Sequence, residues 1–272
     1  MEQLTLHADG ISATIVGQGA ELVSLRDGDG MELLWQAGPA WRRHSPVLFP
    51  IVGRLKGDQL RHRGQTYPMT QHGFARDRRF AWAEQGPAAC TLVLTDDAET
   101  RTHYPFAFRL AIGYELKPRQ LSVTFEIANT GDEPLPASIG AHPAFNWPLL
   151  PELPKEAYRL TFAEKEPAPV RRLKDGLLLP DPQPTPIEGK TLPLSEKLFV
   201  DDAPSSSTGQ PAPACAMQLR AGRRSRCRGR DSTSWGSGPS PAARRSSASS
   251  HGTASPAPPI STASSPTSRV SC

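Results

Sequence analysis

Cysteine is scarce, with four in this sequence of 272 residues. Only Cys90 lies in the first 203 residues, and the others are Cys215, Cys227 and Cys272. No C-x-x-C pair or other zinc-ligand spacing occurs, which excludes a disulfide framework and a structural zinc site. We therefore expect a protein of a reducing compartment that uses no metal and no cofactor.

Long hydrophobic runs are also missing. No stretch approaches the 18 apolar residues that a membrane-spanning helix needs. The opening MEQLTLHADG lacks the basic and apolar segments of a signal peptide. These absences predict a cytoplasmic protein without a membrane partner.

The hydrophobic content of 37% is low, and the shortfall is concentrated in the segment from Pro204 to Cys272, here called the tail. The tail has 18 Ser, 10 Ala, 9 Pro and 9 Arg, but no Lys and one acidic residue. Of the 31 basic and 27 acidic residues, 9 and 1 lie in the tail, so residues 1–203 carry −4 and the tail +8. This composition predicts a folded domain over 1–203 and a disordered tail over 204–272. The net charge of +4 therefore does not indicate a nucleic-acid-binding surface.

Residues 3–200 consist of short runs in which apolar residues recur near every second position and turn residues stand at the ends. The clearest runs are 11–17, 20–27, 89–97, 106–117, 120–131 and 158–163. Runs 106–117 and 120–131, joined at Pro118–Arg119, predict a hairpin. No window sustains a capped helical period, so the sequence predicts an all-β fold, a large antiparallel β-sandwich.

Two of the seven histidines stand in distinctive settings. His72 lies in YPMTQHGFAR (67–76) and His142 in SIGAHPAFNW (138–147). An imidazole held beside a small residue and near an aromatic one can donate to, or protonate, a sugar or carbonyl oxygen near neutral pH. The alternative is a turn histidine bonded to backbone, and we assign that role to the four others outside the tail, His7, His44, His62 and His103.

Other side chains are candidates for binding a polar ligand. Arg54 follows the apolar run FPIVG, where its guanidinium could fork onto hydroxyl groups, or simply be solvated. Asp201 and Asp202 close the last strand-like run and could accept hydroxyl protons or cap a turn. Aromatic residues that could stack on a sugar, or pack in the core, are Trp35, Trp41 and Trp147.

Together these motifs resemble the aldose 1-epimerase (galactose mutarotase-like) family. The matching stretches are SPVLFPIVGRLKGDQL (45–60), YPMTQHGFARDRRF (67–80), THYPFAFRLAIGYEL (102–116), FEIANTGDEPLPASIGAHPAFNWPL (125–149) and EKLFVDDA (196–203). The resemblance covers about residues 1–203. It implies a large antiparallel β-sandwich whose concave face binds a free hexose, with an aldose as the small-molecule partner.

The resemblance also implies roles for individual residues. His142 would protonate the ring oxygen, His72 would assist by hydrogen bonding, and Arg54 and Asp202, less directly Asp201, would bind substrate hydroxyls. The family's catalytic base is a glutamate in a Glu-Pro-Trp setting near the C-terminus. The last glutamate of this sequence is Glu196, so the base and the last strands of the family's sandwich are missing from this chain.

The tail can be read as that missing segment translated in a displaced frame. Ser247 to Gly252 can be encoded AGT GCA TCG AGC CAT GGC. Read from the third base, this gives Cys-Ile-Glu-Pro-Trp, with the glutamate codon straddling Ser249 and Ser250. The same displaced frame permits family-like sequence after Ala203, so we expect one frameshift near codon 203; the alternative is an authentic disordered tail.

The sequence thus predicts an isomerase, an aldose 1-epimerase that interconverts α and β anomers by acid–base ring opening, impaired here by loss of the glutamate. The competing hypothesis is a non-catalytic carbohydrate-binding sandwich with a basic tail. Six arginines from Arg220 to Arg230 support it, but they lack the interleaved aromatic residues of a nucleic-acid surface.

Overall fold

The structure is a computed structural model that describes residues 2–199, together with the backbone of four short strands further along the chain. These four are β16 (Ser205–Ser206), β17 (Cys215–Leu219), β18 (Arg224–Gly229) and β19 (Ser268–Ser271). The predicted domain boundary at 203 and the predicted disorder of the tail lie outside the residues described in full.

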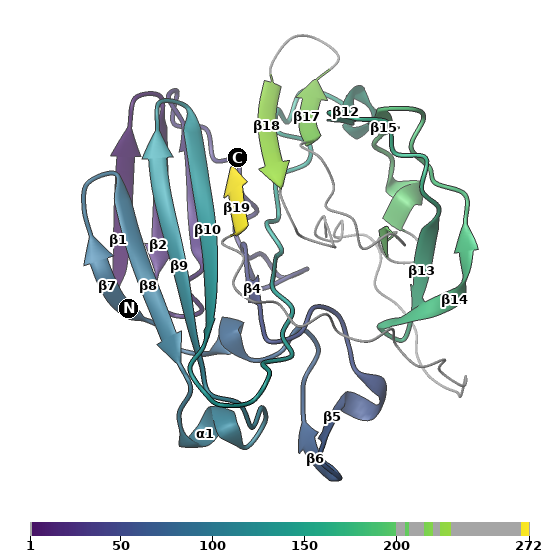
Figure 1. Ribbon diagram of the computed structural model, residues 1–272. Coiled ribbons are helices and arrows are strands. Elements are labelled where there is room, and N and C mark those ends of the chain that lie inside the picture. Colours follow the sequence, from purple (N-terminus) through teal and green to yellow (C-terminus); the bar gives the residue numbers. More distant parts are fainter. Residues whose placement is uncertain (1, 200–204, 207–214, 220–223, 230–267, 272) are drawn as a thin grey trace.

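The first sheet has three antiparallel strands in the order β1 (Gln3–Ala8), β2 (Ile11–Val16) and β3 (Leu22–Asp27). Gly10, at a φ of +69°, makes the tight turn between the first two strands. β1 and β2 contact β9 of the second sheet, so the two sheets face each other on one side of the molecule (Figure 1).

The second sheet has nine strands in the order β15-β12-β17-β18-β19-β10-β9-β8-β7. Its fully described strands are β7 (Ala81–Gln85), β8 (Ala89–Thr95), β9 (Phe108–Lys117), β10 (Gln120–Asn129), β12 (Tyr158–Phe162) and β15 (Thr191–Pro193). β9 and β10 pair over their full length across the turn at Pro118–Arg119, which confirms the predicted hairpin.

The main core lies between these two sheets. Buried residues alternate along β8, with Cys90, Leu92 and Leu94 pointing inward, as the period-two pattern predicts. Phe108 is fully buried and lies 5.1 Å, ring centroid to ring centroid, from Phe49. This core holds Val47 and Phe49, which begin the segment that leads to the candidate site.

Smaller elements complete the described chain. They are β4 (Val47–Leu48) paired with β11 (Gly140–Ala141), the hairpins β5 (Gln59–His62) with β6 (Gln65–Pro68) and β13 (Val170–Lys174) with β14 (Leu177–Gln183), the one-turn helix α1 (Ala98–Arg101), and 3-10 turns at Lys56–Asp58, Ala75–Asp77, Lys155–Ala157 and Glu196–Phe199. The all-β antiparallel fold is thereby confirmed. Within the described residues, no helix has the length and apolar character needed to cross a bilayer.

Candidate functional site

The site begins where β4 and β11 pair. Leu48 lies opposite Gly140, and Val47 lies opposite Ala141. His142 follows β11 directly, and its backbone N–H donates to the carbonyl of Pro46 at 3.1 Å. A two-strand contact therefore fixes where the His142 side chain leaves the backbone.

The turn that carries His72 docks on the chain leaving β4. The backbone N–H of His72 donates to the carbonyl of Gly53 at 2.7 Å, and the N–H of Gly53 donates to His72 Nδ1 at 3.0 Å. His72 has a φ of +67° and Gly73 one of +70°. A Cβ on Gly73 would lie 2.2 Å from the carbonyl oxygen of Phe49, so only glycine fits there.

This docking sets the proton on His72. Because Nδ1 accepts from the Gly53 N–H, the neutral ring carries its proton on Nε2. The Nε2–H is then a hydrogen-bond donor. The sequence predicted a polar role for His72, with a turn histidine bonded to backbone as the alternative. The structure shows the backbone bond of the alternative at Nδ1, and the polar role of His72 stays a prediction.

The structure brings the two predicted histidines together. The ring centroids of His72 and His142 lie 6.3 Å apart, with an angle of 69° between the rings. The ring of Trp41 lies 5.2 Å from that of His142, tilted by 40°. Trp35 holds the Trp41 segment, because its indole N–H donates to the Trp41 carbonyl at 2.8 Å. Two imidazoles and an aromatic ring therefore converge on one place.

Arg54 is adjacent to this pair through Gly53. Its Nε and Nη2 donate to the two carboxylate oxygens of Asp58 at 2.6 and 2.5 Å, and its Nη1 donates to the carbonyl of Asp175 at 3.2 Å. The hydrogen bond to Arg54 holds the pKa of the Asp58 carboxyl below its usual range, and Asp58 raises the pKa of Arg54. The Arg54 side chain is 40% exposed, which leaves it open to a ligand.

The remaining candidates are Asp201, Asp202 and Trp147. Asp201 and Asp202 fall outside the described residues. Trp147 packs in a separate cluster, where its indole N–H donates to the carbonyl of Lys155 at 2.9 Å and the Lys155 ammonium lies 5.2 Å from its ring centroid. Packing is thus the observed use of Trp147, whereas Trp41 is the tryptophan beside His142.

Among the remaining histidines, two make contacts that need no ligand. His62 lies 3.3 Å from a Glu133 carboxylate oxygen and its ring packs on Phe106. His103 places Nδ1 2.9 Å from the carbonyl of Pro68. The contact of His103 with a backbone carbonyl fits the role expected for it, whereas the contacts of His62 are with side chains.

Sequence reasoning missed one arginine beside the site. The Nη2 of Arg76 donates to the carbonyl of Gln71, the neighbour of His72, at 2.6 Å. Burial and the nearby positive charge of Arg43 lower the pKa of Arg76. The sequence signal that could have identified Arg76 is its position in the same HGFAR stretch as His72.

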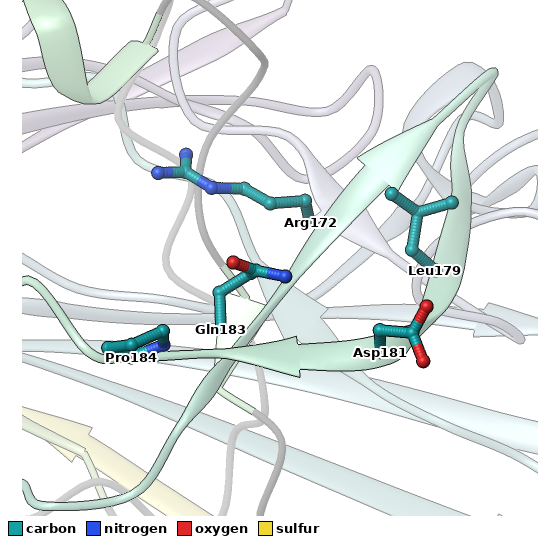
Figure 2. A pocket seen from close by; sticks show the side chains of 5 residues that line it. All are labelled: Arg172, Leu179, Asp181, Gln183 and Pro184. Carbon is teal, nitrogen blue, oxygen red and sulfur yellow. The ribbon is translucent and has the colours of Figure 1, made fainter.

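A shallow cavity of about 430 Å³ lies along the β13–β14 hairpin. Its lining residues are Arg172, Leu179, Asp181, Gln183 and Pro184 (Figure 2). None of them is a candidate named above, so the candidate site is the group formed by the two histidines and Arg54 and not this hollow.

Comparisons with known proteins bear on the family and the fold of this chain. The sequence profile of the family described as Aldose 1-epimerase matches residues 2–225. The plasmid and chromosomal LacX proteins of Lactococcus lactis subsp. lactis are each 36% identical to this chain over 195 residues, 68% of this chain and 65% of theirs. The chain thus spans slightly less than two thirds of the length of these curated relatives.

Two solved structures resemble the fold closely. A galactose mutarotase related enzyme from Lactobacillus acidophilus superposes with a TM-score of 0.79 at 33% identity, covering 85% of this chain and 78% of that one. A galactose mutarotase-like protein from Lactobacillus casei ATCC 334 superposes with a TM-score of 0.75 at 31% identity, covering 84% and 79%. The fold is therefore galactose mutarotase-like, and the chain belongs to the aldose 1-epimerase family.

Proposed function

We propose that this domain binds a free aldose between His72, His142 and Arg54 and is built to interconvert its α and β anomers. The observation that carries the proposal is the meeting of the two imidazoles, 6.3 Å apart, beside an arginine that is partly open to solvent. Both rings are near enough to reach oxygens of one bound sugar ring.

The reaction needs an acid and a base that act together. A base removes the proton from the anomeric hydroxyl while His142 gives a proton to the ring oxygen, and the bond from C1 to the ring oxygen breaks. The aldehyde formed turns about its bond to C2, and closure returns both protons to their donors. The Nε2–H of His72 supports the ring oxygen by hydrogen bonding, and the guanidinium of Arg54 orients the hydroxyls. Asp202, or its neighbour Asp201, binds a further hydroxyl.

The catalytic base is the group for which this chain has the weakest candidate. Glu196, the last glutamate, is engaged in an ion pair with Lys155 at 2.6 Å. Family resemblance assigns the base to a glutamate that the displaced frame encodes across Ser249 and Ser250. A single frameshift near codon 203 therefore accounts for its loss, and the chain as it stands should catalyse little. A cytoplasmic location stays a prediction.

Polarimetry of freshly dissolved α-D-glucose and α-D-galactose tests the proposal. The present chain should be slower than a chain restored to the displaced frame after codon 203 by about 10²–10⁴-fold, the usual contribution of a positioned base. His142→Gln in the restored chain should remove the gain, and it also controls for host enzyme carried through purification.

Each outcome has a meaning. Fast mutarotation by the present chain would contradict the account of the missing glutamate. A restored chain that binds these sugars but does not change their rotation would favour the non-catalytic binding module. Resequencing the gene at codon 203 then separates a sequencing error from a true mutation.

A further inference from the structure

The tip of the β13–β14 hairpin is a sharply defined turn. Lys174 pairs with Leu177, which leaves Asp175 and Gly176 as a two-residue loop. Their φ values are +54° and +79°. Two successive left-handed residues with the sequence Asp-Gly are typical of the tight hairpin turn that matches strand twist. The position of the tip is therefore set by its own backbone.

This tip packs on Arg54, which lies 121 residues earlier than Asp175. The carbonyl of Asp175 accepts from Arg54 Nη1 at 3.2 Å. A Cβ added to Gly176 would lie 3.0 Å from Arg54 Cδ and 3.7 Å from Gln71 Nε2. Gly176 is thus needed both for its left-handed backbone and for its close approach to the arginine.

Asp58 holds the other edge of the same guanidinium through two hydrogen bonds, at 2.6 and 2.5 Å. A guanidinium has five N–H groups. Within the described chain three of them are used, by Asp58 and the Asp175 carbonyl, so one remains on each terminal nitrogen of Arg54. Two such groups suit the adjacent hydroxyls of a sugar.

We propose that Asp58 and the Asp175–Gly176 turn are positioning residues that clamp Arg54 beside His72, so that its two remaining N–H groups point at sugar hydroxyls. The inference rests on the proposed function and deepens it. A long flexible side chain that is already ordered loses less conformational entropy when the ligand binds. The clamp should therefore act on sugar affinity through Arg54 and through no other group.

The test uses the full chain as it is, with D-galactose and D-glucose titrated against tryptophan fluorescence, since Trp41 lies beside His142. Asp58→Asn and Gly176→Ala should each raise the Kd about ten-fold, the loss expected when hydrogen bonds to a charged group are misplaced. The chain offers a matched control in the β5–β6 turn. Gly64 has a φ of +75° after Arg63 at +48°, and a Cβ there meets nothing within 4 Å. Gly64→Ala should leave the Kd unchanged.

A double-mutant cycle separates positioning from general damage. If the turn acts through Arg54, Gly176→Ala should cost no further affinity in an Arg54→Ala background. Equal losses in both backgrounds, or an unchanged Kd in both single variants while Arg54→Ala weakens binding, would overturn the clamp. An Arg54→Ala variant that binds as well as the parent would instead overturn the assigned sugar-binding role of Arg54.

An NMR measurement tests the clamp on Arg54 without any sugar. In protein labelled with ¹⁵N-arginine, the Arg54 Nε–H signal, assigned by its loss in Arg54→Ala, should exchange slowly with water in the parent and in Gly64→Ala. It should exchange much faster in Asp58→Asn, with Gly176→Ala between the two. Failure of the parent to bind either sugar would contradict the proposed function, whereas unchanged exchange in both clamp variants would contradict the clamp.

Discussion

The two ends of the described domain are built very differently. In residues 2–146, 24 buried side chains form one continuous cluster between the two sheets. In residues 147–199, the corresponding cluster has two buried members, Tyr158 and Leu194, with partly buried neighbours around them. Leu178 and Leu179 in β14 are exposed by 59% and 36%. We call these parts the first and second regions.

The contrast shows that the first region is packed by many side chains of its own, whereas the second has few. Both regions border later strands in the large sheet, because β10 of the first region pairs with β19 and β12 of the second lies between β15 and β17. The histidines belong to the first region, and the hairpin that clamps Arg54 belongs to the second. The proposed binding geometry is thus shared between a well-packed part and a loosely packed one.

The largest expected effect is the difference in the free energy of unfolding between substitutions in the two cores. Phe108 is fully buried against Phe49 and Tyr104, so Phe108→Ala should cost about 3–5 kcal/mol of the free energy of unfolding. Leu194→Ala removes a 7% exposed side chain from a small cluster beside Tyr158, and should cost less, about 2 kcal/mol, since a loosely built site can collapse around the cavity. Urea unfolding measures both. Equal costs would show that the second region is as well packed as the first.

The sequence predicted the first region better than the second. Strands β8, β9 and β10 follow the period-two pattern because one face of each is buried. β14 contains Pro180 and Pro182 and is not among the runs that the sequence predicted; it is the edge of its sheet in the order β14-β13-β16. A proline there need not donate to a neighbour, so the edge position overrides the local signal.

The site was predicted in part for a similar reason. His72 and His142 could be singled out from their local motifs. Their distance, and the bond from Gly53 to His72, depend on how β4, β11 and the turn at 72–73 pack, which no local pattern encodes. The contact of Arg54 with Asp175 spans 121 residues and could not be predicted at all.

Thiol labelling probes the first region alone. Burial raises the pKa of Cys90 to about 12. A raised pKa means that the stabilisation from the buried thiol is complete below the unfolded-state pKa of about 8.5 and is lost as the pH rises towards the folded value. With Cys215, Cys227 and Cys272 replaced by serine, iodoacetamide at pH 8 should alkylate the folded chain on the order of 10³-fold more slowly than the unfolded chain, because thiolate is scarce. Fast labelling would show that the first region opens readily.

The smallest expected effect concerns the Glu166 carboxyl in the second region. Glu166 has a buried Oε1 that finds no hydrogen-bond partner among the described residues, and burial raises the pKa of its carboxyl. A carboxyl whose folded pKa is raised gives its full stabilisation below the unfolded pKa and loses it as the pH rises through the folded one. Glu166→Gln should therefore raise the Tm by about 1–2 °C at pH 7 and leave it unchanged well below pH 4. Calorimetry at the two pH values measures this, and a lower Tm at pH 7 would mean that the carboxylate has a stabilising partner, so that the second region is more complete than its core implies.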